Sequence, residues 1–295
     1  MDKKLNILLP NQLFENSPLL KNQSDFILVE EYLFFNQFKF HKQKLLFHRI
    51  TMKNYQYYLE SQDRKVIYIE STDAESDIRN LLVNRCPDLK EIEIIDPDDY
   101  YIQKRISNFC KKNHIKLIIH ENPSFMTKKS ELNDFFKKDK KKFFQTSFYK
   151  SQRKKFNILI DENAKPTGGD WTYDVMNREK YPKNKKPPKI EFTKINDKLF
   201  SESVNFINSN YSQNPGIMDA KFIYPTDHKS AKLWFLKFLK DRFNEFGPYE
   251  DSIVKEESFL NHSLLSPLIN SRLITPEFIV KESIVFYKKN GIMIN

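Results

Sequence analysis

Residues 92–119 decide the fold, and they read Ile92-Glu-Ile-Ile-Asp-Pro-Asp-Asp-Tyr-Tyr-Ile-Gln-Lys-Arg-Ile-Ser-Asn-Phe-Cys-Lys-Lys-Asn-His-Ile-Lys-Leu-Ile-Ile119. An apolar run stands at each end of this stretch, at 92–95 and at 115–119. Both runs are short, rich in Ile and Leu, and not strictly alternating. Runs of this kind are typical of strands that are buried on both faces, as in a parallel sheet.

The part between the two runs has a helical pattern. Apolar residues recur at spacings of three and four within residues 100–112, at Ile102, Ile106, Phe109 and Cys110. This spacing places them on one face of a helix. Asp98 and Asp99 stand where a helix needs a side chain that accepts from its first free amides. The stretch therefore predicts a strand, a helix and a second strand.

The same alternation begins at the amino terminus. Three further strand candidates are Leu5–Leu9, Phe26–Val29 and Lys65–Ile69, and helical patterns follow at 44–59 and 77–83. Because crossovers between parallel strands are right-handed, this order predicts a doubly wound α/β domain with a five-stranded parallel sheet, Rossmann-like (HUP) in type, over residues 1–125.

The turn after the first strand reads Pro10-Asn11-Gln12-Leu13 and contains no glycine fingerprint. A ligand at the carboxyl ends of the strands would then be held without a glycine phosphate cradle. This absence argues against a nucleotide-binding α/β enzyme of unrelated chemistry.

The charge is concentrated in one segment. The chain carries a formal net charge of +10, and residues 126–155 alone contain 11 Lys and Arg against 3 Asp and Glu, interleaved with phenylalanines. One interpretation is a solvated pair of helices with an aromatic inner face. The other is a surface that contacts nucleic-acid phosphates, for which the candidate residues are Lys140, Lys141, Lys142, Arg153 and Lys154.

The rest of the chain predicts a linker and a helical domain. Residues 126–190 combine the basic segment with a loop that ends in a Pro- and Lys-rich stretch at 181–189, typical of an interdomain connection. Residues 191–295 are helical in pattern, with an apolar stripe along 228–246. A further helix is expected after Thr275, with Pro276 in its first turn. No further helix follows the last one, so we expect this helical domain to be incomplete.

Cysteine content and hydropathy exclude several classes. Two cysteines, Cys86 and Cys110, cannot form a disulfide framework or a four-thiolate metal site, so no metal is expected. The first residues do not form a signal peptide, and no apolar run approaches the roughly 20 residues that span a bilayer. A cytoplasmic protein without a membrane partner is expected.

Three segments in a fixed order carry a resemblance to a known family. They are Gly168-Gly-Asp-Trp-Thr-Tyr-Asp-Val-Met-Asn-Arg178, Phe246-Gly-Pro-Tyr-Glu-Asp251 and Asn261-His-Ser-Leu-Leu-Ser-Pro267. Taken by itself, the third is a hydroxyl-rich turn before a helix, which suits either a serine N-cap or a phosphate site. Together the segments resemble the photolyase–cryptochrome superfamily, in its photolyase-related branch with the bacterial (6-4) photolyases.

The resemblance implies an α/β antenna domain, then an all-helical domain that binds FAD, and light-driven repair of pyrimidine lesions in DNA. The family's flavin-phosphate loop maps onto Tyr249, His262, Ser263, Leu265 and Ser266, where His262 replaces the threonine of other photolyases. A second chromophore, a lumazine or similar molecule, would lie near the carboxyl ends of the first strands. The residues expected there are Asn11, Gln12 and Glu30, although Glu30 suits a structural salt bridge equally well.

The chain departs from the family in length. Relatives continue into helices that carry most flavin contacts, the catalytic groups and four iron–sulfur cysteines, and two remote cysteines cannot hold such a cluster. We therefore expect an incomplete flavin domain, inactive alone, whose missing half a second chain could supply. The alternative is a non-enzymatic, basic nucleic-acid-binding module derived from the same fold.

Overall fold

The computed structural model of the chain describes residues 4–173, 177–191, 197–218 and 224–292. Contacts divide these residues between two compact units. Unit 1 contains residues 1–124, 192–232 and 266–275, and unit 2 contains residues 125–191, 233–265 and 276–295. Residues 192–232 and 266–275 thus belong with the amino-terminal region. The domain boundaries predicted at 125 and 190 divide the chain into consecutive segments, and they stay a prediction.

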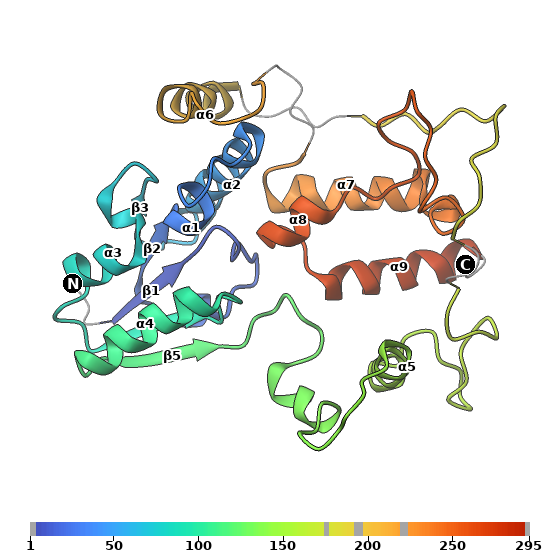
Figure 1. Cartoon of the computed structure of the whole chain (residues 1–295), viewed down its shortest axis with the longest axis horizontal. Coiled ribbons are helices and arrows are strands. Elements are labelled where there is room, and N and C mark those ends of the chain that lie inside the picture. Colours follow the sequence, from blue (N-terminus) through green and yellow to red (C-terminus); the bar gives the residue numbers. More distant parts are fainter. Residues whose placement is uncertain (1–3, 174–176, 192–196, 219–223, 293–295) are drawn as a thin grey trace. The chain divides into compact units, whose positions relative to one another are not determined.

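Unit 1 is built on a five-stranded, all-parallel sheet (Figure 1). The strands are β1 (Lys4–Leu8), β2 (Asp25–Val29), β3 (Val66–Ile69), β4 (Glu91–Ile95) and β5 (Lys116–His120). Their spatial order is β3-β2-β1-β4-β5, so Leu5 of β1 lies opposite both Asp25 and Ile92. The predicted doubly wound parallel sheet of five strands is confirmed.

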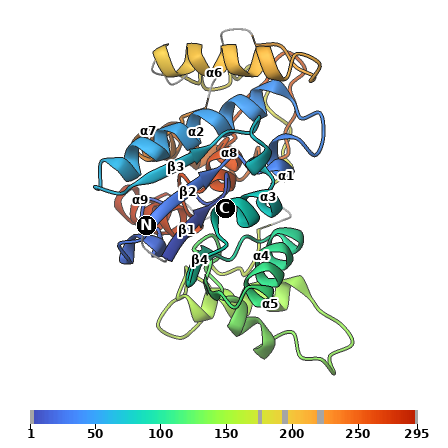
Figure 2. The same ribbon diagram turned by 90° about the vertical axis from the view of Figure 1, so that its left-hand side faces the viewer.

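Helices cover both faces of this sheet (Figure 2). The helices of unit 1 are α1 (Tyr32–Phe35), α2 (Lys42–Glu60), α3 (Ile78–Arg85), α4 (Tyr100–Lys112), α6 (Asp197–Asn210) and α8 (Ser266–Ser271). α2 lies on one face and α3 and α4 lie on the other, while α6 packs on the outer side of α2. Carboxylates cap two of them: Asp99, as predicted, accepts from the Ile102 amide, and Asp77 accepts from the Arg79 amide.

The hydrophobic core follows from the alternation of side chains along the strands. Leu5 and Ile7 of β1 face α3 and α4, where they join a buried cluster with Ile102, Ile106 and Cys110. Leu8 is fully buried and lies outside that cluster. Because both faces of the sheet are covered, its strands are short and rich in Ile, Leu and Val, with few polar residues such as Asn6 and Glu93. This pattern located them in the sequence.

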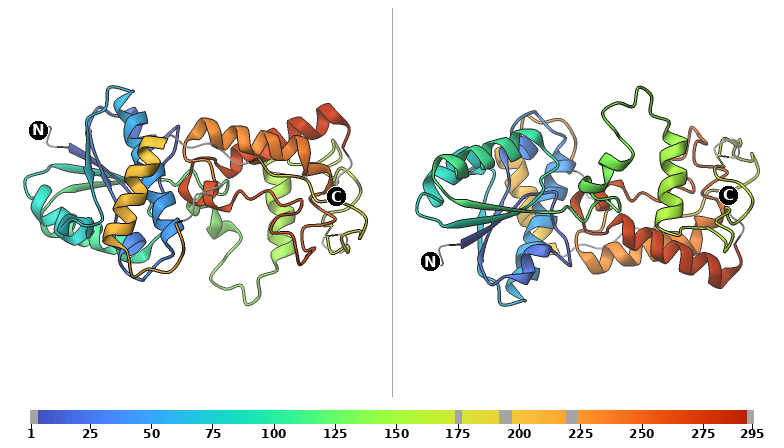
Figure 3. Two further views of the ribbon diagram at one scale, coloured as in Figure 1. Left: turned by 90° about the horizontal axis from the view of Figure 1, so that it is seen from above. Right: turned by 90° about the horizontal axis from the view of Figure 1, so that it is seen from below.

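Unit 2 is mainly helical. Its regular elements are the 3-10 turn η3 (Lys129–Asp134), α5 (Gln145–Lys155), most of α7 (His228–Asp241), the 3-10 turn η4 (Phe243–Glu245) and α9 (Pro276–Asn290). α7 and α9 lie side by side (Figures 1 and 3). Ring contacts join Phe235 to Phe278 at 5.8 Å and Phe243 to Phe286 at 6.3 Å, so both helices run in the same direction.

The outer faces of α7 and α9 expose apolar side chains. Leu233 and Leu236 on α7 are 57% and 42% exposed, and Val285 on α9 is 52% exposed. α9 itself has no fully buried residue among those the structure describes. Neither helix is long and apolar enough to cross a membrane, nor is any other helix in the described ranges.

Candidate functional site

The hydroxyl-rich turn at residues 262–266 is held by two side chains of α7 and its carboxyl-terminal extension. The indole Nε1 of Trp234 donates to the carbonyl oxygen of Ser263 at 3.2 Å, and Nε of Arg242 donates to the carbonyl oxygen of His262, also at 3.2 Å. Leu265 is buried, whereas Ser263 is half-buried. The turn is therefore anchored through two of its carbonyls.

These two hydrogen bonds fix the direction of the amides. In a trans peptide the carbonyl and the following N–H point in opposite directions. Since the carbonyls of His262 and Ser263 face Arg242 and Trp234, the amides of Ser263 and Leu264 face away from them. Leu264 has a left-handed backbone, with φ of 58°. Consecutive amides beside a left-handed residue form a concave anion-binding arrangement.

The turn that carries Tyr249 lies against the same loop. Nε2 of His262 is 3.0 Å from the carbonyl oxygen of Glu250, one residue after Tyr249. The Tyr249 ring packs on Tyr181, with centroids 4.9 Å apart, and the Lys185 ammonium lies 5.1 Å from its centre. The structure thus brings the turn that carries Tyr249 to His262, which lies 13 residues further along the sequence. Ser266 is the exposed first residue of α8.

Two polar residues beside the loop were not predicted from the sequence. Arg242 is 3% exposed, and burial lowers its pKa from the usual value. It places a cation behind the turn. Asn261 is 1% exposed, donates to Glu245 at 3.3 Å, and has a buried Oδ1 without a partner among the described residues. The sequence offered one signal for Arg242: it is a cation within the Phe-rich stretch of residues 228–246.

The candidate DNA-contacting residues occupy different environments. Lys141, Lys142 and Lys154 are exposed, whereas Lys140 is half-buried and lies 3.7 Å above the centre of the Phe135 ring. Arg153 is only 5% exposed. Its guanidinium donates to the carbonyls of Ile158, Leu159 and Trp171 and thereby holds the loop after α5. The lysines provide the exposed positive charge of this segment.

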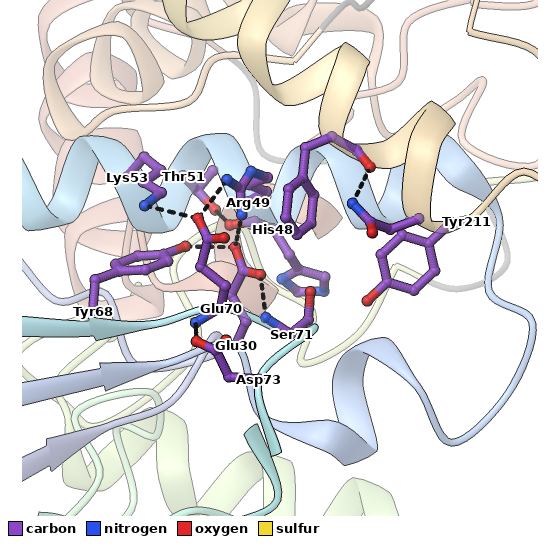
Figure 4. Close-up of polar contacts among 12 residues, drawn as sticks. Glu30, His48, Arg49, Thr51, Lys53, Tyr68, Glu70, Ser71, Asp73 and Tyr211 are labelled. Atoms are coloured by element: carbon purple, nitrogen blue, oxygen red, sulfur yellow. Dashed lines mark hydrogen bonds and ion pairs between the residues drawn. The ribbon is translucent and has the colours of Figure 1, made fainter. Parts of the chain in front are cut away.

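Glu30 lies at the carboxyl end of β2 and is fully buried (Figure 4). Its Oε1 accepts from Arg49 at 2.9 Å and from the Tyr68 hydroxyl at 2.6 Å, and its Oε2 accepts from the Ser71 amide at 2.8 Å. Burial, together with the Glu30 charge, raises the pKa of Tyr68 well above its usual value. All three donors come from unit 1, and together they satisfy both carboxylate oxygens.

Arg49 is the centre of this network. Besides Glu30 it donates to Glu70 at 2.8 Å, and its guanidinium lies flat against Phe206 of α6 at 3.5 Å from the ring centre. Burial opposes ionisation of Glu70, but the Arg49 hydrogen bond and charge outweigh it and lower the pKa of Glu70. The central place of Arg49 was not predicted from the sequence, because the position of Glu70 after β3 becomes informative only when the strand order is known.

The other two antenna candidates stand where the strand order reverses, between β1 and β4. Gln12 is fully buried and bridges these strands, donating to the Ile95 carbonyl at 3.0 Å and accepting from the Leu9 amide at 3.2 Å. Asn11 donates to the Pro97 carbonyl at 3.4 Å, and its buried Oδ1 has no partner among the described residues. Ligands of open α/β sheets bind at such a reversal.

Glu31, which is fully buried after β2, faces the half-buried Arg105 of α4. Oε1 of Glu31 is 3.9 Å from NH1 of Arg105, and neither atom has a hydrogen-bond partner within the described ranges. Oε2 of Glu31 accepts from the Leu33 amide at the start of α1. Burial raises the pKa of Glu31 to about 7, because loss of hydration outweighs the amide bonds and the charge of Arg105.

Unit 1 also contains a small cavity of about 210 Å³ between α2 and the start of α7. Stacked Tyr55 and Tyr58 and the edge of His228 form its aromatic wall. Pockets for flavin-sized ligands measure roughly 300–1,000 Å³, so this cavity is too small for a second chromophore. In the described ranges no group of three or more His, Cys, Asp or Glu residues could hold a metal ion, and Cys86 and Cys110 are buried free thiols.

A parallel sheet of this order, with helices on both faces and a largely helical region after it, defines a doubly wound α/β protein. The family model of the deoxyribodipyrimidine photo-lyase-related proteins matches residues 6–222. The chain belongs to this family, as the sequence resemblance implied.

Individual relatives agree with this assignment. A protein of Acanthamoeba polyphaga mimivirus, described only as uncharacterized, is 36% identical over 190 residues, which cover 61% of this chain and 96% of that protein. A (6-4) photolyase of Agrobacterium fabrum is 23% identical over 282 residues, 93% of this chain and 54% of the enzyme. The chain therefore spans about half the length of that photolyase.

The fold resembles that of a solved photolyase. The crystal structure of a bacterial class III photolyase from Agrobacterium tumefaciens matches with a TM-score of 0.52 and 14% sequence identity. The match covers 98% of this chain and 54% of the other. At this identity the likeness concerns the fold.

Replacement of Arg49 by methionine should strongly destabilise unit 1. The change leaves Glu30 buried without its cation, and broken buried ion pairs cost about 3–5 kcal/mol. Urea unfolding followed by circular dichroism measures the effect. The control is Arg79→Met, which removes an arginine whose side chain is 62% exposed and should cost less than about 1 kcal/mol. Equal losses in the two variants would contradict the central role of Arg49.

Replacement of Glu31 by glutamine should change how stability depends on pH. Because the folded-state pKa of Glu31 is raised, its contribution is most favourable below pH 4.5 and is lost as the pH rises towards about 7. The melting temperature of Glu31→Gln minus that of the wild-type chain should therefore be higher at pH 8 than at pH 5. Melting temperatures across this range measure the difference, with Glu60→Gln on the surface as control. Parallel curves for wild type and Glu31→Gln would refute the raised pKa.

Proposed function

We propose that this chain functions as a photolyase-related flavoprotein in the light-driven repair of ultraviolet lesions in DNA. Membership in the photolyase-related family supports the proposal, and the anchored turn at 262–266 is the observation that carries it. The amides of Ser263 and Leu264 face away from Trp234 and Arg242, as a phosphate-binding loop requires.

In this proposal the turn holds the pyrophosphate of FAD. The amides of Ser263 and Leu264 and the hydroxyls of Ser263 and Ser266 donate to phosphate oxygens, with Leu265 as the buried anchor. Tyr249 and His262 close the same side of the loop. Arg242 lies behind the turn and adds a positive charge that favours an anion. When bound, FAD would supply the light-driven electron transfer to a pyrimidine lesion.

DNA is the proposed macromolecular substrate. The exposed ammoniums of Lys141, Lys142 and Lys154 would contact phosphates, and Lys140 would add charge beside them. Arg153 would contribute indirectly, since it holds the backbone after α5 through three carbonyls. A net charge of +10 supports an anionic partner in general.

A second, light-harvesting chromophore would bind in unit 1 at the carboxyl ends of β1 and β4. The unpartnered Oδ1 of Asn11 is an acceptor for such a ligand, and Gln12 shapes the floor by joining the two strands. Glu30 would act indirectly, because Arg49, Tyr68 and Ser71 already occupy its oxygens.

Further helical polypeptide would complete the flavin domain. Leu233, Leu236 and Val285 expose apolar surface on α7 and α9, and such surfaces are normally covered. The covering helices would belong either to the same polypeptide or to a second chain. Their role would be to enclose the flavin rings and exclude water from the reaction.

A second candidate function is supported by the basic segment at residues 126–155. The chain would then be a non-enzymatic nucleic-acid-binding module with the same α/β unit. The two functions differ in whether the chain binds flavin. A chain that binds DNA with a steep salt dependence but never retains FAD would favour the module.

Replacement of Ser266 by alanine should weaken FAD binding about tenfold. The change removes one hydrogen bond to a charged phosphate, worth roughly 1.5 kcal/mol. Quenching of flavin fluorescence on titration with the chain measures affinity, and thermal unfolding confirms that the variant is folded. The control is Ser201→Ala, an exposed serine on α6. The phosphate-loop proposal would have to be abandoned if both variants bound FAD as the wild-type chain does.

A further inference from the structure

Residues 135–149, which we call the Phe/Lys segment, combine a ring cluster with exposed charge in unit 2. The segment contains Phe135, Phe136, Phe143, Phe144, Phe148 and Tyr149, together with Lys137, Lys138, Lys140, Lys141 and Lys142. Five lysines against a single acidic residue, Asp139, give it strong positive charge. The phosphate contacts proposed above account for the lysines but not for the aromatic residues.

Four of the phenylalanines form a packed cluster. Phe148 of α5 contacts Phe135 and Phe136, with centroids 5.0 and 5.3 Å apart, and Phe136 also contacts Phe143 at 5.2 Å. Phe135 and Phe148 meet edge to face, at 61°, and the other two pairs are tilted at 48° and 46°. The cluster fixes the backbone before α5 and therefore fixes the position of the residues at its edge.

Two rings at the edge of the cluster face solvent. Phe143 is 50% exposed and Phe144 is 62% exposed. They directly follow Lys141 and Lys142, which are exposed as well. Exposed adjacent phenylalanines on an ordered backbone are unfavourable in water and usually mark a contact surface. Their partner must also tolerate adjacent positive charges.

The geometry disfavours a membrane as that partner. Lys141–Phe144 form no regular secondary structure, and Phe144 has an extended backbone, with φ of −109° and ψ of 117°. Neighbouring side chains on an extended backbone project to opposite sides. A flat lipid surface could therefore accommodate one of the two rings, whereas a flexible single strand can reach both.

We propose that Phe143 and Phe144 stack on unpaired bases of single-stranded DNA while Lys141 and Lys142 contact the neighbouring phosphates. Aromatic side chains that alternate with cations are the usual platform for single strands, because every base has a face on which a ring can stack. In a duplex the base faces are already stacked and inaccessible. This inference deepens the proposed function, on which it rests for DNA as the partner, and adds a preference for unpaired strands.

Fluorescence anisotropy with the full chain tests the inference. The probes are a labelled oligothymidylate of about 20 nucleotides and an undamaged duplex of the same length, in the dark and without added flavin. The double variant Phe143→Ala, Phe144→Ala should bind the single strand about tenfold to a hundredfold more weakly. It should keep both its affinity for the duplex and its salt dependence.

Two further variants separate stacking from charge. Lys141→Gln together with Lys142→Gln should weaken both probes and reduce the slope of log affinity against log salt by about 1–2. Phe38→Ala removes a 64% exposed phenylalanine of unit 1 and should change neither probe. Thermal unfolding of every variant excludes loss of the fold as the cause.

Three outcomes would overturn the inference. The first is unchanged single-strand affinity of the double Phe variant, and the second is an equal loss on both probes. The third is tight binding to vesicles containing about 30% phosphatidylserine that is lost in the double Phe variant, while oligonucleotide binding is the same in the variant and the wild-type chain. A wild-type chain that binds neither probe at low salt would remove DNA as the partner in both proposals. Failure of flavin binding alone would leave the stacking result standing.

Discussion

The buried guanidinium of Arg49 holds unit 1 together. It neutralises Glu30 at the end of β2, hydrogen-bonds Glu70 at the end of β3, and supports the Phe206 ring of α6. One side chain from α2 thus joins the sheet to a helix about 150 residues further along the chain. A charge at this depth is tolerated only because its partners are in place, which ties the carboxyl ends of the strands to one arrangement.

Two hydrogen bonds fix the turn at 262–266. Trp234 and Arg242 hold two successive carbonyls, and the planarity of the peptide turns the next amides the other way. The direction of these amides therefore depends on two side chains that lie on the carbonyl side of the turn. The same principle applies to Arg153, a cation whose role is to hold carbonyls after α5.

Much of the fold could be predicted because its signals are local. β1, β2 and β4 are almost entirely buried, so each is rich in apolar residues and stands out in the sequence. Asp77 and Asp99 act as caps at the predicted helix starts. The helix predicted over 228–246 ends earlier, at Asp241, because the chain turns into the 3-10 segment that brings Phe243 to Phe286. That contact joins distant residues and leaves no local signal.

The sequence by itself determined the parallel sheet, the basic Phe/Lys segment and the family, because hydrophobic period, charge and ordered motifs are all properties of contiguous residues. Only the tertiary structure decided which polar groups are engaged and which are accessible. Glu30, Arg153 and Lys142 are all charged in the sequence, yet the first two are buried against specific partners and the third is exposed. The reason is physical: a charge may leave water only where distant parts of the chain supply its hydrogen bonds, and that supply is set by packing.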